Sequence, residues 1–201
     1  KCRDRCSIER DAHRAGAMLR RVNPNRGRPY NAQVNDALSP HPYSGLTPDV
    51  VLHAVESAGF LADGRQLALN SYENRVYQVG LEEDQGGPLG DARFLVAKFY
   101  RPGRWSREAL QDEHDFMRKL VESEVPVIAP LTLRDGGTLG SHEGMYFAIY
   151  PKKSGRTFDE YTDEQWLELG HLIGRVHTVG AGLRPRDRIT MAPDKSTRSQ
   201  V

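Results

Sequence analysis

The sequence has few cysteines, no long hydrophobic run and almost no net charge. Its two cysteines, Cys2 and Cys6, both lie at the start of the 201 residues, so a fold built on disulfides is excluded and a reducing, cytoplasmic setting is expected. No run of about 18 or more apolar residues occurs, and no charged-then-apolar leader is recognisable, so we expect no membrane partner. The formal net charge is only +1, so the overall charge does not identify a partner.

Residues 1–45 differ in composition from the rest of the chain. They contain nine Lys and Arg against four Asp and Glu, a balance of +5, and proline and glycine interrupt them repeatedly. We interpret this segment as a disordered basic arm. Cys2, Cys6 and His13 could hint at a metal site, but two unstructured thiols without a full ligand set are the simpler interpretation. Few side chains here can stack on bases, which makes nucleic acid an unlikely partner.

From Leu46 onward the sequence predicts alternating helices and strands. Thr47 and Ser106 have the character of helix N-caps, and Thr162 with Gln165 forms a capping box. The hydrophobic patterns predict helices over 47–58, 106–122 and 162–180, strands on either side of a turn at 70–74, and further strands over 94–100, 125–133 and 145–151. Residues 134–144 are predicted to form a loop.

This order of elements predicts an α+β fold. The first part is a five-stranded antiparallel sheet with a helix, as in the N-terminal lobe of a protein kinase. Of the C-terminal lobe, only the first helix follows. The predicted boundaries are a basic arm over 1–45, the kinase-like lobe over 46–150, and the hinge with a truncated start of the second lobe over 151–201. The stripe Trp166, Leu169, Ile173 and Val176 on the last helix is expected to stay partly exposed.

Two charged residues stand where apolar ones are expected. Lys98 interrupts the apolar strand FLVAKFY, and Glu113 falls inside the arc of Leu110, Met117, Leu120 and Val121 on the following helix. A buried charge needs a partner of opposite sign, so we predict that the two residues pair. Such a pair is poor evidence for stability. It is either a structural ion pair with a solvent-seeking lysine or a lysine held so that its ammonium faces phosphate oxygens.

The kinase-like order suggests where a nucleotide would lie. The turn 70–74, NSYEN, would fold over the phosphates, with backbone N–H groups and the Ser71 hydroxyl as donors. Val96, two residues before Lys98 on the same strand face, would lie against the adenine, and the strand end after FAIYP would offer backbone groups to the base. The histidines of the predicted helices have no metal spacing, so each is treated as ordinary helix surface or core edge; they are His53, His114, His171 and His177.

Several segments together resemble one known family. LNSYENRVYQ, VAKFYRPGRW, DEHDF, EVPVIAPL, YFAIYPKKSGR and LGHLIGRVHTVG are similar to the bacterial stress response kinase A family, which is related to aminoglycoside phosphotransferases and choline kinases. The resemblance covers roughly residues 46–182. It implies that Ser71 contacts ATP, that Lys98 grips the α- and β-phosphates with Glu113 as its partner, and that Ile149, Tyr150 and Pro151 form the hinge beneath the adenine.

The resemblance also implies transfer of the ATP γ-phosphate to protein serine or threonine hydroxyls, with Mg²⁺, in the cytoplasm. The family's H-G-D-x-x-x-x-N and D-x-D segments, which supply the catalytic aspartate and the Mg²⁺ ligands, are not found in the 201 residues. We therefore expect no catalytic residue and no metal ligand within the chain, and no turnover by the chain alone. The alternatives are a non-catalytic interaction module and a fragment of a small-molecule phosphotransferase.

Overall fold

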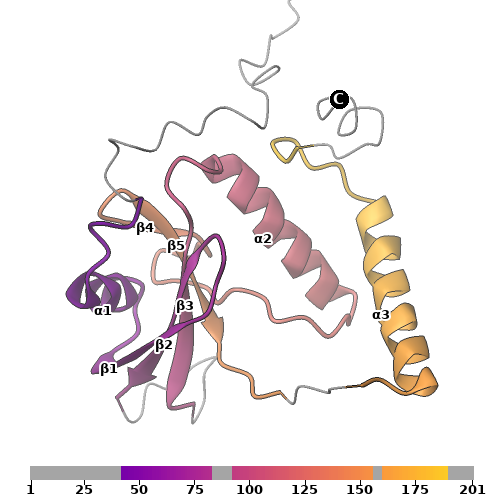
Figure 1. Cartoon of the computed structure of the whole chain (residues 1–201). Helices are drawn as coiled ribbons and strands as arrows, with labels where there is room; N and C mark the ends of the chain where they lie inside the picture. The colour runs from indigo at the N-terminus through magenta and orange to yellow at the C-terminus, as the bar shows by residue number, and fades with distance from the viewer. Residues whose placement is uncertain (1–41, 83–91, 156–159, 190–201) are drawn as a thin grey trace, which may run out of the picture.

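A computed structural model of the chain describes residues 42–82, 92–155 and 160–189 (Figure 1). Nearly all of the predicted basic arm lies outside the described residues, including Cys2, Cys6 and His13. The elements in chain order are α1 (Pro48–Ser57), β1 (Ala62–Leu69), β2 (Arg75–Leu81), β3 (Phe94–Phe99), α2 (Arg107–Glu122), β4 (Gly140–His142), β5 (Met145–Pro151) and α3 (Asp163–Ala181). Among the described residues, no helix has the length and apolar character needed to cross a membrane.

The five strands form one sheet in the order β1-β2-β3-β5-β4. Each neighbouring pair is antiparallel, which confirms the predicted five-stranded antiparallel sheet. The central position of β3 explains why its sequence is apolar on both faces, since each face is covered by a helix. Figure 1 shows α1 on one side of the sheet and α2 on the other.

The two faces of the sheet belong to two different cores. Leu95, Ala97 and Phe99 of β3 point toward α1 and pack in a cluster with Val51 and Val55 of that helix. The rings of Phe99 and Phe147 stack there with centroids 5.6 Å apart. On the other face a smaller cluster forms under α2, with Tyr100, Leu110, Leu139 and Ala148 as its buried members. Val96 and Lys98 also face this second side.

The predicted helix starts are present. Thr47 accepts a hydrogen bond from the Val50 amide at 3.4 Å, and Ser106 accepts one from Ala109 at 3.1 Å. The capping box at the start of α3 is also formed, with both reciprocal bonds in place. These side chains satisfy amides that would otherwise lack partners in the first turn of each helix.

The fourth strand does not lie where the sequence predicts it. Residues 125–133 are not a strand; Pro126 and Pro130 within them lack the N–H needed for ladder hydrogen bonds. β4 instead comprises Gly140–His142, inside the segment predicted to be a loop, and pairs with β5. Glu143 and Gly144 connect these strands with φ of 49° and 75°, as a tight two-residue hairpin requires.

The inward face of α2 also differs from the prediction. Leu110 and Leu120 are buried as expected, but Val121 is 50% exposed. His114 belongs to the buried face of α2 and is only 2% exposed, so of the two predicted alternatives, helix surface or core edge, it lies on the core side. On α3 the expected partial exposure is observed: Trp166 is 57% and Ile173 45% exposed, and none of its residues is buried.

Candidate nucleotide-binding site

The predicted ion pair between strand and helix is formed. Lys98 Nζ donates to Glu113 Oε1 at 3.1 Å, and each side chain is 24% exposed. Lys98 lies opposite Val76 on β2 and Ala148 on β5, so its stem is enclosed by the middle of the sheet. The lysine also places its Nζ 4.5 Å from the centroid of the Tyr100 ring. The Lys98–Glu113 pair is thus packed against the sheet and the Tyr100 ring on one side and is open to solvent on the other.

The ion pair lines a cleft of about 370 Å³ between the sheet and α2. This volume is within the range of small-molecule sites. The walls are mainly apolar, with a few charged groups among them: Val76, Val96, Lys98, Glu113, Met117, Ile128, Tyr150, Pro151 and Lys153. An apolar surface next to a lysine suits a ligand that has an apolar part at one end and negative charge at the other.

The predicted base-binding residues do not all reach this cleft. Val96 and Tyr150 face each other across β3 and β5, and both line it. Ile149 does not, because its side chain is fully buried in the core under α1 and its carbonyl accepts the Leu131 amide at 2.7 Å. Lys153, just after β5, was not predicted; a lysine pair directly following an apolar strand is the only sequence signal for it.

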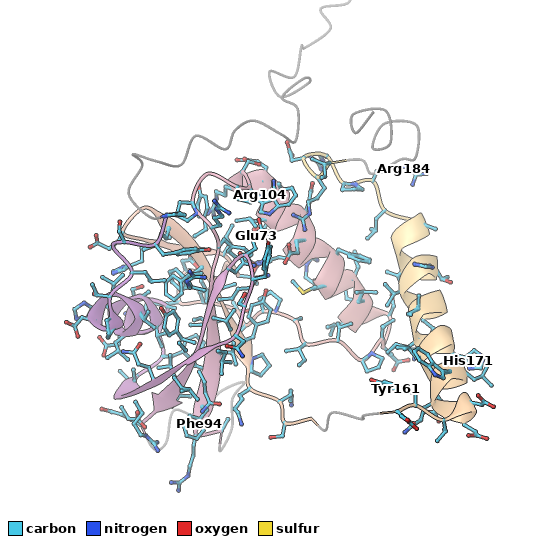
Figure 2. All side chains as sticks on the ribbon, viewed as in Figure 1. Glu73, Phe94, Arg104, Tyr161, His171 and Arg184 are labelled. Carbon is cyan, nitrogen blue, oxygen red and sulfur yellow. The ribbon has the colours of Figure 1, made fainter. Side chains whose placement is uncertain are left out.

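The loop between β1 and β2 is held in place through Glu73. Arg104 donates from Nε to Glu73 Oε1 at 2.6 Å, and the Tyr43 hydroxyl donates to the Glu73 carbonyl at 2.8 Å. Figure 2 shows Glu73 and Arg104 together where this loop approaches the N-terminal end of α2. Ser71 is exposed at the start of the same loop and is not among the cleft residues. The loop is therefore anchored with its serine hydroxyl in solvent.

A chain of buried polar groups lies behind the cleft. The Tyr100 hydroxyl is 2.8 Å from His114 Nε2 and 3.4 Å from the Tyr150 hydroxyl, and His114 Nδ1 is 2.8 Å from Thr138 Oγ1. Burial lowers the pKa of His114 to about 4, so the imidazole is neutral at pH 7. Burial also raises the pKa of Tyr150 to about 12 and that of Tyr100 further, so both phenols keep their protons. Through Tyr150, this chain reaches the cleft wall.

Residues 184–189, which follow α3, return to α2 and complete the surroundings of the ion pair. Asp112 Oδ2 accepts the backbone amides of Arg186, Asp187 and Arg188 at 3.0, 2.8 and 3.3 Å. Arg188 Nη2 then donates to Glu113 Oε2 at 2.7 Å. Sequence reasoning missed this contact because the segment has no periodic pattern, and its partner is 75 residues away.

No metal site is visible in the part of the chain that the structure describes: no group of three or more His, Cys, Asp or Glu is arranged to hold an ion there. Glu113 is occupied by two cations, and Asp112 by three amides. Glu113 on the cleft wall and its neighbour in sequence, Asp112, therefore already have partners. Mg²⁺ prefers carboxylate oxygens with room for its waters, and these two do not fit that requirement.

Comparison with known proteins agrees with this geometry. The model of the phosphotransferase enzyme family (APH) matches residues 64–199. Stress response kinase A of Escherichia coli K12 is 41% identical over 138 residues, which are 69% of this chain and 39% of that protein. Serine/threonine protein kinase RdoA of Salmonella typhimurium has the same identity and coverage. The chain thus spans about two fifths of the length of these relatives.

Solved structures of kinases share the fold at lower identity. Amicoumacin kinase hAmiN, in complex with AMP-PNP, Ca²⁺ and Ami, superposes with a TM-score of 0.57 at 20% identity, over 73% of this chain and 45% of that one. The microcompartment-associated aminopropanol kinase gives 0.55 at 16% identity, over 74% of this chain and 46% of that one. At such identity the likeness concerns the fold. On the strength of the family match and the curated relatives, this chain belongs to the phosphotransferase enzyme family.

Proposed function

We propose that this chain is the nucleotide-binding lobe of an ATP-dependent kinase, and that ATP occupies the cleft between the sheet and α2. The observation that carries the proposal is the Lys98–Glu113 pair at 3.1 Å on the cleft wall. A lysine that donates one N–H to a carboxylate oxygen keeps further N–H donors for phosphate oxygens. Val96 and Tyr150 supply an apolar wall of the kind that an adenine ring contacts.

The cleft gives the nucleotide an orientation. With its phosphates at Lys98, the base would lie toward the Tyr150–Pro151 end of β5. Ser71 would contact ATP only if its loop closed over the cleft, since the serine is exposed and outside the lining. The Ile149 side chain has no part in this proposal, because it belongs to the core on the other face.

The phosphate acceptor proposed is a protein serine or threonine hydroxyl. The name of the Salmonella relative, a serine/threonine protein kinase at 41% identity, supports this assignment. A small-molecule hydroxyl is the second candidate, favoured by the solved structures with the same fold that are named an amicoumacin kinase and an aminopropanol kinase. Because ATP is a cytoplasmic metabolite, the proposed setting is the cytoplasm.

The 201 residues by themselves are proposed to bind ATP without transferring its phosphate. They contain no H-G-D-x-x-x-x-N segment and no D-x-D, and the described residues form no cluster that could hold Mg²⁺. Phosphoryl transfer needs a group that orients the nucleophile and a metal that neutralises the developing charge. The proposed Mg²⁺ ligands would therefore come from outside these residues.

Binding of ATP to the chain, measured by calorimetry or by displacement of a fluorescent nucleotide, tests the proposal. Lys98→Ala should weaken ATP binding at least about tenfold, as expected for loss of a charge-assisted contact. Lys119→Ala is the matched control: it removes an exposed lysine of α2 that pairs with Glu122 at 2.6 Å, away from the cleft, and should leave affinity unchanged. Absence of ATP binding by the parent chain refutes the proposal. Phosphate transfer by the parent chain that is lost in Lys98→Ala refutes the proposal that the 201 residues are inactive by themselves.

A further inference from the structure

The segment after α3 is tied to α2 by one carboxylate oxygen. Asp112 Oδ2 accepts three successive backbone amides, those of Arg186, Asp187 and Arg188, at 3.3 Å or less. Figure 1 shows the chain returning from the end of α3 toward α2 at this point. Three consecutive N–H groups turned toward one oxygen form a concave arrangement that fixes the local backbone. The segment therefore presents the Arg188 side chain in a defined position.

In that position, Arg188 contacts the second carboxylate oxygen of Glu113, the glutamate of the proposed phosphate site. Arg188 Nη2 donates to Glu113 Oε2 at 2.7 Å, while Lys98 Nζ donates to Oε1 of the same carboxylate at 3.1 Å. Its guanidinium carbon also lies 4.5 Å from the centroid of the Trp105 ring. The Arg188 side chain is 29% exposed, comparable with the 24% of Glu113. One carboxylate is thus shared between two cations that come from distant parts of the sequence.

Stability alone is a poor explanation for this arrangement. Taking charges out of water costs free energy that their attraction often fails to recover. In addition, Arg188 Nη1 is buried without a hydrogen-bond partner among the described residues, which adds a further cost. The consequence for a ligand is clearer. Lys98 with Glu113 is a neutral pair, whereas Lys98, Glu113 and Arg188 together carry a charge of +1.

We propose that Arg188 is a positioning residue for the nucleotide phosphates, acting through Glu113. By occupying Oε2, it fixes the carboxylate and reduces the hold of Glu113 on the ammonium of Lys98, so that the lysine keeps its charge available to phosphate oxygens. Residues 184–189 are then part of the site, although they lie beyond the segment in which kinase-like motifs were recognised. This inference rests on the proposed binding of ATP in the cleft.

The experiment compares ATP with adenosine, which has the base and sugar but no phosphate. In the 201-residue chain, Arg188→Ala should weaken ATP binding by roughly three- to tenfold, the effect expected of one partly exposed charge, and should change adenosine binding by less than about twofold. Arg188→Lys keeps the charge and should recover most of the ATP affinity. Asp112→Ala releases the segment without altering the three charged side chains, and should cause a smaller loss in the same direction.

Arg184→Ala is the matched control from the same segment, because among the described residues Arg184 donates to the nearby carbonyls of Ala181 and Leu183. Figure 2 shows Arg184 beyond the end of α3. The substitution should leave both ligands unaffected. Unchanged ATP affinity in Arg188→Ala overturns the inference, and so does an equal loss for ATP and adenosine, which would indicate a merely structural role. If Lys98→Ala weakens ATP binding and Arg188→Ala does not, the inference fails while the proposed function stands. No ATP binding by the parent chain overturns both.

Discussion

The buried His114 should make this fold sensitive to mild acid. The side chain is only 2% exposed, and its two ring nitrogens lie 2.8 Å from the Tyr100 hydroxyl and 2.8 Å from Thr138 Oγ1. Burial lowers its pKa from the usual 6.5 to about 4; nearby Lys98 acts in the same direction, and Glu113 opposes it. The folded chain therefore resists protonating this ring, while the unfolded chain does not.

The sign and size of the effect follow from this difference in pKa. Below pH 6.5 the unfolded state binds a proton that the folded state excludes until pH falls to about 4, so acid favours unfolding across this window. Between pH 7.5 and pH 5 the free energy of unfolding should fall by about 2 kcal/mol from this group alone. For a domain whose total stability is about 5–15 kcal/mol, such a loss is readily measured.

Urea denaturation followed by circular dichroism at pH 7.5 and pH 5 measures the effect. The parent chain should lose about 2 kcal/mol more than His114→Gln, whose side chain keeps hydrogen-bonding capacity and cannot protonate in this range. His171→Gln, which replaces an exposed histidine of α3, is the control and should behave as the parent does. Equal pH dependence in the parent and in His114→Gln would refute the reasoning. Comparing each variant with itself at two pH values removes any constant cost of the substitution.

Two further predictions concern the sheet and the loop above the cleft. Gly140→Ala should destabilise the fold by about 1–3 kcal/mol, because a Cβ there would lie 2.5 Å from Cζ of Phe147. In a Phe147→Leu background the ring is absent, so the same substitution should cost less. Additive effects of the two substitutions in denaturation would contradict this explanation. Glu73→Gln should weaken the 2.6 Å contact with Arg104 and lower the free energy of unfolding by no more than about 1 kcal/mol. It should also speed amide hydrogen exchange in residues 70–74. Unchanged exchange would show that the ion pair does not hold the loop.

Local patterns in the sequence were enough to predict most of the fold. The N-caps Thr47, Ser106 and Thr162 lie at the observed helix starts, because capping depends only on a side chain and amides two or three residues away. β4 was missed because three residues are too few for a periodic pattern; its pairing with the Met145 end of β5 depends on a tight turn. For His114 the sequence left helix surface and core edge open, because burial of a polar ring depends on Tyr100 and Thr138, which other segments supply.

Strand and helix periodicities were enough to predict that one lysine and one glutamate would meet under a sheet, because each periodicity turned a charge inward. The surroundings of that pair depend on the folded chain. It turned Ile149 away from the cleft, brought Lys153 to its wall, and placed Arg188 on the same carboxylate as Lys98. The physical reason is that periodicity records which way a side chain points along its own element. A contact across 75 residues depends on how the chain returns, and no local pattern encodes that path.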